Sequence, residues 1–202
     1  MTSKVGAAAE AYKVGLAQLR LMVDAVEREV LDSTGSSRLI TDNINFFTKS
    51  FLISLCAHLE MCVKDVVYVI AGDLDERVSA ACIPSSIIDW RYSKKKGDSS
   101  SGALQRFAVG MTKKEVDDLV SGNVYRTRDA LALVGVDLSA DKATWETWKE
   151  LIQNIVTRRN NIVHRNDEAS DLSFGDVRQY IDCTDAYIDF IIATCDAALP
   201  RN

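Results

Sequence analysis

The sequence predicts an all-α fold, an up-and-down bundle of about four long helices. Apolar side chains recur every three or four residues along four long stretches, which is the period of an amphipathic helix. Only 2 prolines and 10 glycines occur in 202 residues, so long helices are rarely interrupted. No stretch has a credible strand pattern. Antiparallel neighbours are the simplest arrangement of such helices.

Two of the long helices are predicted in the first half of the chain. The first covers residues 4–31. The second covers residues 41–72, with Thr41 and Asp42 as candidate N-caps and with Gly72 as its end, since glycine commonly stops a helix. Its wide apolar stripe predicts the buried centre of the bundle.

Two further long helices are predicted near the C-terminus. One covers residues 141–163 and carries Trp145 and Trp148, whose spacing favours a place in the core or in a dimer interface over a platform that stacks bases. The other covers residues 174–198 and follows a capping-box pattern that opens with Ser173.

The middle of the chain is predicted to be a partly helical insertion into this bundle. It covers residues 73–140 and has no long apolar element of its own, so residues 1–202 are expected to form a single domain. A capping box between Thr112 and Glu115 marks the start of one short helix. The short helices are predicted over residues 84–92, 113–121 and 124–134.

The charge balance limits the class of partner. The formal net charge is −5 at pH 7 and the sequence pI is about 5.1, which argue against a protein that coats nucleic acid through a broad basic face. They allow an RNA enzyme with one local basic pocket. The run Lys94–Lys96 lies in a Gly/Ser-rich stretch, 93–102, and is more typical of a solvated loop than of an RNA-contacting arm.

Cysteine usage and the lack of long apolar runs predict a cytoplasmic protein that does not enter a membrane. The 5 cysteines form an odd set without a C-x-x-C pair, and their apolar surroundings predict reduced, buried thiols. Met1–Glu10 lacks the hydrophobic region of a secretory signal. No run approaches the roughly 18 apolar residues of a membrane span.

No constellation in the sequence predicts a metal or a cofactor. His58 and Cys62 lie four residues apart and share a helix face, as two metal ligands can. No second pair accompanies them, so a core histidine beside a core cysteine is the better interpretation. We therefore expect neither a metal nor a cofactor.

A basic, polar cluster lies at the end of the helix predicted over 141–163. Residues 158–166 hold three arginines, three asparagines and a histidine with no acid among them, and His164 is one of only 2 histidines in the chain. The plain interpretation is a basic helix end, where cations complement the helix dipole. The alternative is a phosphate site, because arginine binds phosphate through a planar fork and histidine transfers protons near neutral pH.

The arrangement Arg159-Asn160-x-x-x-His164 resembles the Arg-x4–6-His motif of the HEPN superfamily. Its position fits as well, because an apolar helix precedes it, and a polar loop and a final amphipathic helix follow it. Glu60 interrupts the apolar run Cys56–Val63 and matches an acidic residue in the second helix of many HEPN domains.

This resemblance implies an all-α, metal-independent endoribonuclease. It covers residues 41–72 and 141–199 and is closest to the RiboL-PSP-type HEPN group. In such enzymes the 2′-OH of RNA attacks its own adjacent phosphate and leaves a 2′,3′-cyclic phosphate. Many of these domains serve in toxin–antitoxin or anti-virus defence and typically dimerise. The implied partners are therefore RNA such as tRNA, a second copy of the chain, and an antitoxin or sensor protein.

The same resemblance implies a role for each residue of the cluster. His164 is the general base or acid, Arg159 stabilises charge on the phosphate, and Asn160 is a positioning residue. Glu60, from the neighbouring helix, orients Arg159 or His164, although a structural salt bridge explains Glu60 equally well. The residues implied to contact the RNA are Arg158, Asn161 and Arg165.

Helix geometry leaves two questions open. Arg158 and Arg159 both fit the spacing of the motif, so either can be the catalytic arginine. Arg159 and His164 lie roughly 140° apart around a helix, so they meet within one chain only if Arg159 reaches back or the helix frays near His164. A two-fold axis that joins two copies of the motif in one composite pocket is the other solution.

The alternative function is a catalytically silent HEPN-like module that binds nucleotide, RNA or a partner protein. The intact Arg-Asn-x-x-x-His trio favours the enzyme over this module, because a silent module has no chemical need for all three side chains.

Overall fold

A computed structural model describes residues 3–32, 38–92, 105–165 and 171–199, with Arg165 described by its backbone alone. These residues form eight helices and no β-strand, which confirms the predicted all-α class. The helices are α1 (Lys4–Leu31), α2 (Arg38–Thr41), α3 (Ile44–Ala80), α4 (Ser85–Tyr92), α5 (Lys113–Leu119), α6 (Val124–Leu133), α7 (Lys142–Arg165) and α8 (Phe174–Ala198).

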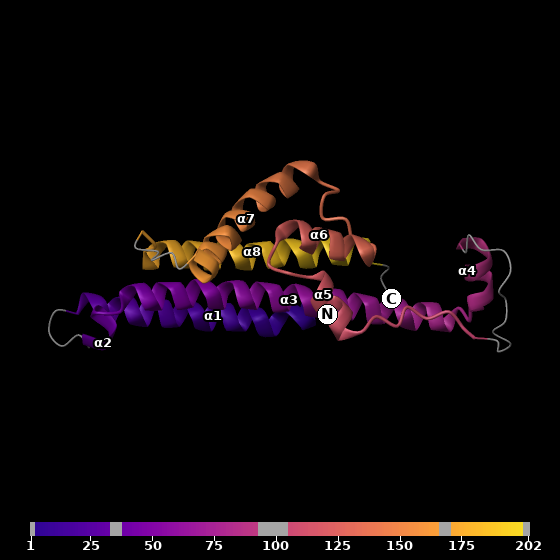
Figure 1. Cartoon of the computed structure of the whole chain (residues 1–202), viewed down its shortest axis with the longest axis horizontal. Coiled ribbons are helices and arrows are strands. Elements are labelled where there is room, and N and C mark those ends of the chain that lie inside the picture. Colours follow the sequence, from indigo (N-terminus) through magenta and orange to yellow (C-terminus); the bar gives the residue numbers. More distant parts are fainter. Residues whose placement is uncertain (1–2, 33–37, 93–104, 166–170, 200–202) are drawn as a thin grey trace.

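The four long helices α1, α3, α7 and α8 form the bundle and alternate in direction along the chain (Figure 1). α1 packs along both α3 and α8, and α7 lies slanted across α3 and α8. The short helix α6 packs against α7 and α3, and α5 packs on α3. α4 stands apart at the far end of α3. The predicted helical bundle is therefore confirmed.

The core lies where α3 faces the other long helices. Leu52, Leu55, Val67 and Ile70 of α3 are fully buried, as the wide apolar stripe predicts. Burial of each such side chain contributes about 1.5–3 kcal/mol, so this one helix anchors the fold. The buried side chains that meet it from the neighbouring helices include Leu16, Val23, Ile152, Ile188 and Ile191.

The two tryptophans of α7 belong to this core, as predicted. Trp145 is 3% exposed, which leaves no ring face for a base. The ring of Trp148 stacks on that of Phe190 in α8, with centroids 6.0 Å apart, and also lies against Tyr187. These rings fix the middle of α7 on α8, and the basic end of α7 projects beyond them.

The start of α3 differs from its prediction. Thr41 ends the separate short helix α2, and Asn43 takes the N-cap position of α3 in place of Thr41 or Asp42. The Asn43 side chain donates to the carbonyl of Leu39 at 2.8 Å and so caps the end of α2.

The end of α3 also differs, because the helix continues past Gly72 to Ala80. An interior glycine costs a helix only about 1 kcal/mol, which tertiary contacts can offset. Asp73 provides them, since it pairs with Lys4 of α1 at 3.0 Å and with Arg77 one turn later at 3.2 Å. The prediction that this helix ends at Gly72 is therefore wrong.

The section predicted to be an insertion contains the three short helices expected for it. α4, α5 and α6 match the predictions over 84–92, 113–121 and 124–134, and the capping box of Thr112 is present. The stretch that contains Lys94–Lys96 lies outside the described residues. Several side chains from α5, α6 and their connections enter the common core, namely Val116, Val120, Val124, Leu131, Val136 and Leu138. The single domain of residues 1–202 stays a prediction, which this shared core supports.

The cysteines largely follow the expectation of buried thiols. All five are free, and Cys56, Cys62 and Cys195 are buried, whereas Cys183 is half-buried and Cys82 is exposed. None of the helices within the described ranges has the length and apolar character needed to cross a bilayer.

The contact between α1 and α3 at Gly15 offers a test of this packing. A Cβ atom at Gly15 would lie 2.6 Å from the ring of His58, whose Nδ1–H donates to the Ser54 carbonyl at 2.8 Å. We expect Gly15→Ala to lower the free energy of unfolding in urea by about 1–3 kcal/mol through overpacking. Gly72→Ala is the matched control, because nothing lies within 4 Å of its Cβ position. It should stabilise the protein by up to about 1 kcal/mol. If both changes stabilised the protein equally, the close approach of Gly15 to the ring of His58 would be contradicted.

Candidate active site

The basic cluster forms the last two turns of α7, which stays helical through Arg165. The helix therefore does not fray near His164, so the reach of the Arg159 side chain is the only one of the expected routes left within a single chain. Asn160 and His164 lie four residues apart and share one face, as predicted. Figure 1 shows this end of α7 approaching α3 and the start of α8.

Arg159 points from α7 toward α3 and is half-buried. Its Nη1 donates to Oδ1 of Asn160 at 3.0 Å. Its Nε is buried and has no hydrogen-bond partner in the described part of the chain. Burial raises the pKa of the Cys56 thiol on α3 to about 12, while the nearby Arg159 lowers this pKa and Glu60 raises it. These three residues therefore share one region between α3 and α7.

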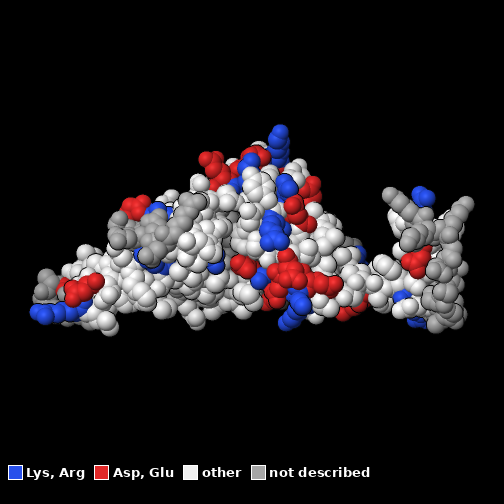
Figure 2. Space-filling view, viewed as in Figure 1, with Lys and Arg blue, Asp and Glu red and all other residues white. Residues whose placement is uncertain are grey.

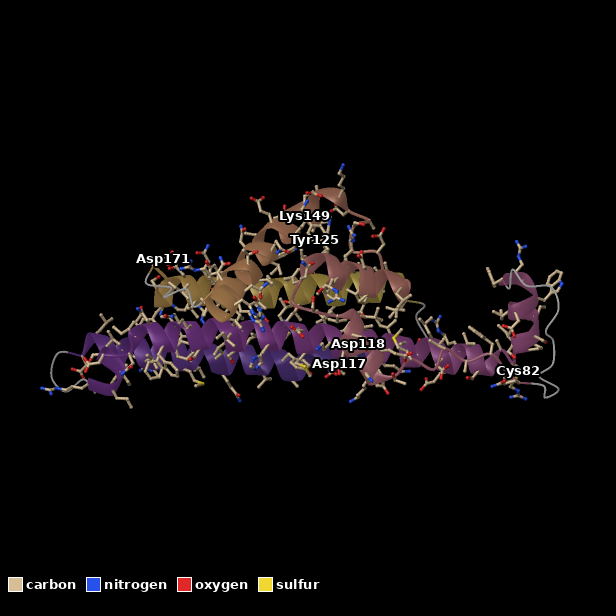
Figure 3. The ribbon with its side chains drawn as sticks, in the orientation of Figure 1. Cys82, Asp117, Asp118, Tyr125, Lys149 and Asp171 are labelled. Carbon is tan, nitrogen blue, oxygen red and sulfur yellow. The ribbon has the colours of Figure 1, made fainter. Side chains whose placement is uncertain are left out.

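Arg158 differs from its neighbour in having a carboxylate partner. Its Nη2 pairs with Asp171, which lies just before α8 and beside the end of α7 (Figure 3). Tyr180 of α8 is also close, because both Arg158 and Asp171 influence the pKa of its hydroxyl, which burial raises. Arg158 therefore links α7 to α8.

Glu60 takes part in an ion-pair network that crosses from α3 to α5. Its Oε1 lies 2.9 Å from Nζ of Lys64, and the same ammonium lies 3.2 Å from Asp117. Among the described residues, Glu60 makes no hydrogen bond or ion pair with Arg159 or His164. The salt bridge that sequence reasoning weighed for Glu60 is present.

His164 is exposed. No hydrogen bond to a described residue holds the imidazole. Asn161 is half-buried, and the side chain of Arg165 lies outside the described residues. Because Arg159 faces α3 and His164 faces solvent, a single chain brings Arg159 together with Asn160 but not with His164.

The second histidine has a structural role. Nδ1–H of His58 donates to its own helix at the Ser54 carbonyl, and its ring packs against Gly15. Burial raises the pKa of the Cys62 thiol to about 12, so this sulfur is protonated at neutral pH. No group of three or more candidate metal ligands occurs within the described ranges.

Charge is mixed on the face of the molecule that Figure 2 draws. Figure 2 shows basic and acidic side chains gathered over α5, α6 and the upper part of α7, with no broad face of one sign in that view. The low pI agrees with this distribution. A polyanion would therefore be held at a few positions of the surface and not along a whole face.

The sequence patterns did not predict a pocket that lies beside α7. An open pocket of about 500 Å³ lies between α6 and α7, and its lining includes Tyr125, Lys149 and Gln153. Tyr125 and Gln153 lie far apart in the sequence and belong to no motif. Only the packing of α6 on α7 brings them together, so no sequence signal was available.

Comparison with known proteins gives one match. The family model described as RiboL-PSP-HEPN matches residues 26–197, which includes the section 73–140 that the motif-based resemblance did not cover. No curated protein and no solved structure matches the chain. HEPN domains are all-α, commonly bind RNA and dimerise, and are often ribonucleases but sometimes non-catalytic. The match spans the end of α1 and almost all of the following helices, and we conclude that the chain belongs to the RiboL-PSP-HEPN family.

Proposed function

We propose that this protein is a metal-independent endoribonuclease in which the end of α7 cleaves RNA by attack of a 2′-OH on its adjacent phosphate. The observation that carries the proposal is the state of Arg159. Its guanidinium makes no ion pair with any described residue, and its buried Nε has no partner. A partly buried cation without an ion pair costs free energy unless an anion binds to it. A phosphate oxygen can be that anion.

The arrangement of Arg159 suits the charge that develops in this reaction. The attack forms a phosphorane-like anion, and a planar guanidinium stabilises it through parallel N–H donors. Asn160 accepts from Arg159 at 3.0 Å and so restrains the plane of the fork. Its amide nitrogen remains a donor that orients the phosphate. Arg158, in contrast, would first have to give up Asp171.

His164 supplies the proton transfer that the reaction needs. Imidazole accepts a proton from the 2′-OH and returns one to the leaving 5′-oxygen near neutral pH. Its exposure on the solvent side of α7 leaves room for a nucleotide or for a second protein chain. Because the helix separates it from Arg159 by roughly 140°, we propose that Arg159 of one copy and His164 of another meet across a two-fold axis.

The remaining members of the predicted site have lesser roles in this proposal. Asn161 and Arg165 contact the RNA backbone near the cut, and Glu60 contributes a negative charge that biases the position of Arg159. The setting that the family suggests is a toxin or an anti-virus defence protein in the cytoplasm, restrained by an antitoxin or sensor protein, with tRNA as the first RNA to test.

The second candidate function is a catalytically silent module that binds RNA, nucleotide or a protein. The distance between Arg159 and His164 within one chain favours it if the protein stays monomeric. RNA binding without cleavage by a dimer of the wild type would also favour it.

The first prediction concerns His164. Purified protein incubated with total tRNA in EDTA should release fragments that end in a 2′,3′-cyclic phosphate. His164→Ala should lower the cleavage rate by on the order of 10²–10⁴, because it removes the proton-transfer group. The variant, purified in the same way, also controls for contaminating nucleases, and its melting temperature should match that of the wild type since the side chain is exposed. Equal cleavage by both proteins would show that His164 is not the proton-transfer group.

The second prediction separates the two arginines. Arg159→Ala should lower the cleavage rate by on the order of 10²–10³, the usual effect of removing one donor to a developing anion. Arg159→Lys should not restore it, because an ammonium lacks the planar fork. Arg158→Ala should retain most of the rate and lose at most about 1 kcal/mol of stability, the value of an exposed ion pair. The reverse ranking of the two alanine variants would transfer the catalytic role to Arg158.

The third prediction tests the composite pocket. Arg159→Ala and His164→Ala chains, co-expressed with different affinity tags and purified through both, form mixed dimers. A pocket shared across the two-fold axis retains one intact Arg159 and one intact His164 in such a dimer, so cleavage should recover well above that of either parent. Mixed dimers as inactive as the parents would show that each site is built within one chain.

A further inference from the structure

The pocket between α6 and α7 has features of a binding site that the cleavage chemistry does not use. Its volume is about 500 Å³, and it is lined by Tyr125 of α6 and by side chains of α7 that include Glu146, Lys149, Glu150 and Gln153. Figure 3 shows Tyr125 and Lys149 next to each other where the two helices approach. The volume is in the range typical of small-ligand sites.

This pocket opens on the same face of α7 as Asn160 and His164. Gln153 lines the pocket, and its Nε2 donates to Oγ1 of Thr157 one turn later at 3.2 Å. Asn160 and His164 follow at spacings of three and four residues, so the four side chains form one row. The row extends about 16 Å along the helix axis from Gln153 to His164. A few nucleotides of a single strand cover such a distance.

The pocket offers an aromatic face. Tyr125 is 44% exposed, so part of its ring is open to a ligand in the pocket. Arg128 lies 5.8 Å from the ring centroid and steadies the ring. Bases stack on such rings irrespective of sequence, since every base has a π-face.

The polar groups of the pocket favour the edge of a base over a phosphate. Glu146 and Glu150 bring two negative charges and Lys149 brings one positive charge, and Lys149 is already paired with Glu146. The net charge repels a phosphate, while carboxylates accept hydrogen bonds from exocyclic amino groups. Gln153 also lines the pocket, and its Oε1 is buried without a partner among the described residues, so this side-chain amide has a hydrogen bond left to make.

We propose that this pocket holds one unstacked base of a single-stranded RNA, a few nucleotides from the phosphate that His164 acts on. Tyr125 stacks on the base, and the Glu150 carboxylate and the Gln153 amide hydrogen-bond to its edge. The pocket therefore prefers the amino-bearing bases adenine, cytosine and guanine over uracil. This subsite rests on the proposed ribonuclease function, because the position of the strand is set by the cut site.

The experiment measures binding of short single-stranded RNA to full-length His164→Ala protein, which does not cut it, by fluorescence anisotropy. Tyr125→Ala in that background should weaken binding about tenfold or more, and Tyr125→Phe should preserve it, as expected when stacking on the ring is lost or kept. Tyr68→Ala is the matched control, because Tyr68 is also an exposed tyrosine with a cation, Lys113, over its ring, but it lies on α3 outside the pocket.

A series of RNAs with one abasic nucleotide at successive positions locates the base. An abasic nucleotide at one of these positions should weaken binding to the parent protein. It should not weaken binding to the Tyr125→Ala variant, because that variant already lacks the ring on which the base stacks. Replacing the base at this position by uracil should also weaken binding. Glu150→Gln should reduce this preference, since an amide both donates and accepts.

The outcomes separate this subsite from the cleavage chemistry. Cleavage by the wild type together with unchanged RNA binding by Tyr125→Ala would overturn the subsite and leave the ribonuclease intact. A position-specific, Tyr125-dependent loss of binding without any cleavage by the wild type would support the subsite and overturn the ribonuclease. If AMP or GMP bound as tightly as the RNA, the pocket would be a site for free nucleotides, and the proposal that it holds one base of a bound RNA strand would be overturned.

Discussion

The unbroken helix of α7 is the constraint on which the candidate site depends. Each turn through Arg165 is hydrogen-bonded, so the direction of every side chain is set by its position in the chain. Arg159 is thereby directed into the seam with α3, and His164 is directed outward. The same regularity lines up His164 with Asn160 and with the pocket at Gln153. If the helix ended two turns earlier, it would fix neither the opposed directions of Arg159 and His164 nor the alignment of His164 with Asn160 and Gln153.

The adjacent arginines show how this regularity assigns different tasks to similar side chains. Successive residues are about 100° apart around a helix, so Arg158 faces α8 and Arg159 faces α3. Arg158 meets Asp171 and fastens α7 to the start of α8. Arg159 meets only an amide and keeps its charge uncompensated by any described carboxylate. Local sequence could not make this distinction, because the carboxylate that decides it lies 13 residues further along the chain.

Periodicity predicted most of the fold. α1, α7 and α8 begin and end within two residues of their predicted bounds, because apolar spacing and capping residues such as Ser173 act locally. The extension of α3 past Gly72 escaped prediction, because it depends on Lys4, which is distant in sequence. For the site, sequence patterns predicted the cluster and the shared face of Asn160 and His164. They could not predict the partners of the arginines or the pocket at Tyr125, which arise from helix packing.

The Cys56 thiol lies beside Arg159, and its burial determines how it reacts with oxidants. Cys56 lies close enough to Arg159 for the cation to act on it, a neighbourhood that in an open site produces a reactive thiolate. Burial dominates here and keeps the pKa of the thiol at about 12, so the sulfur is protonated and shielded at neutral pH. Peroxide and alkylating agents react with thiolates that they can reach. We therefore expect the Cys56 sulfur to react slowly with oxidants although it lies beside a cation.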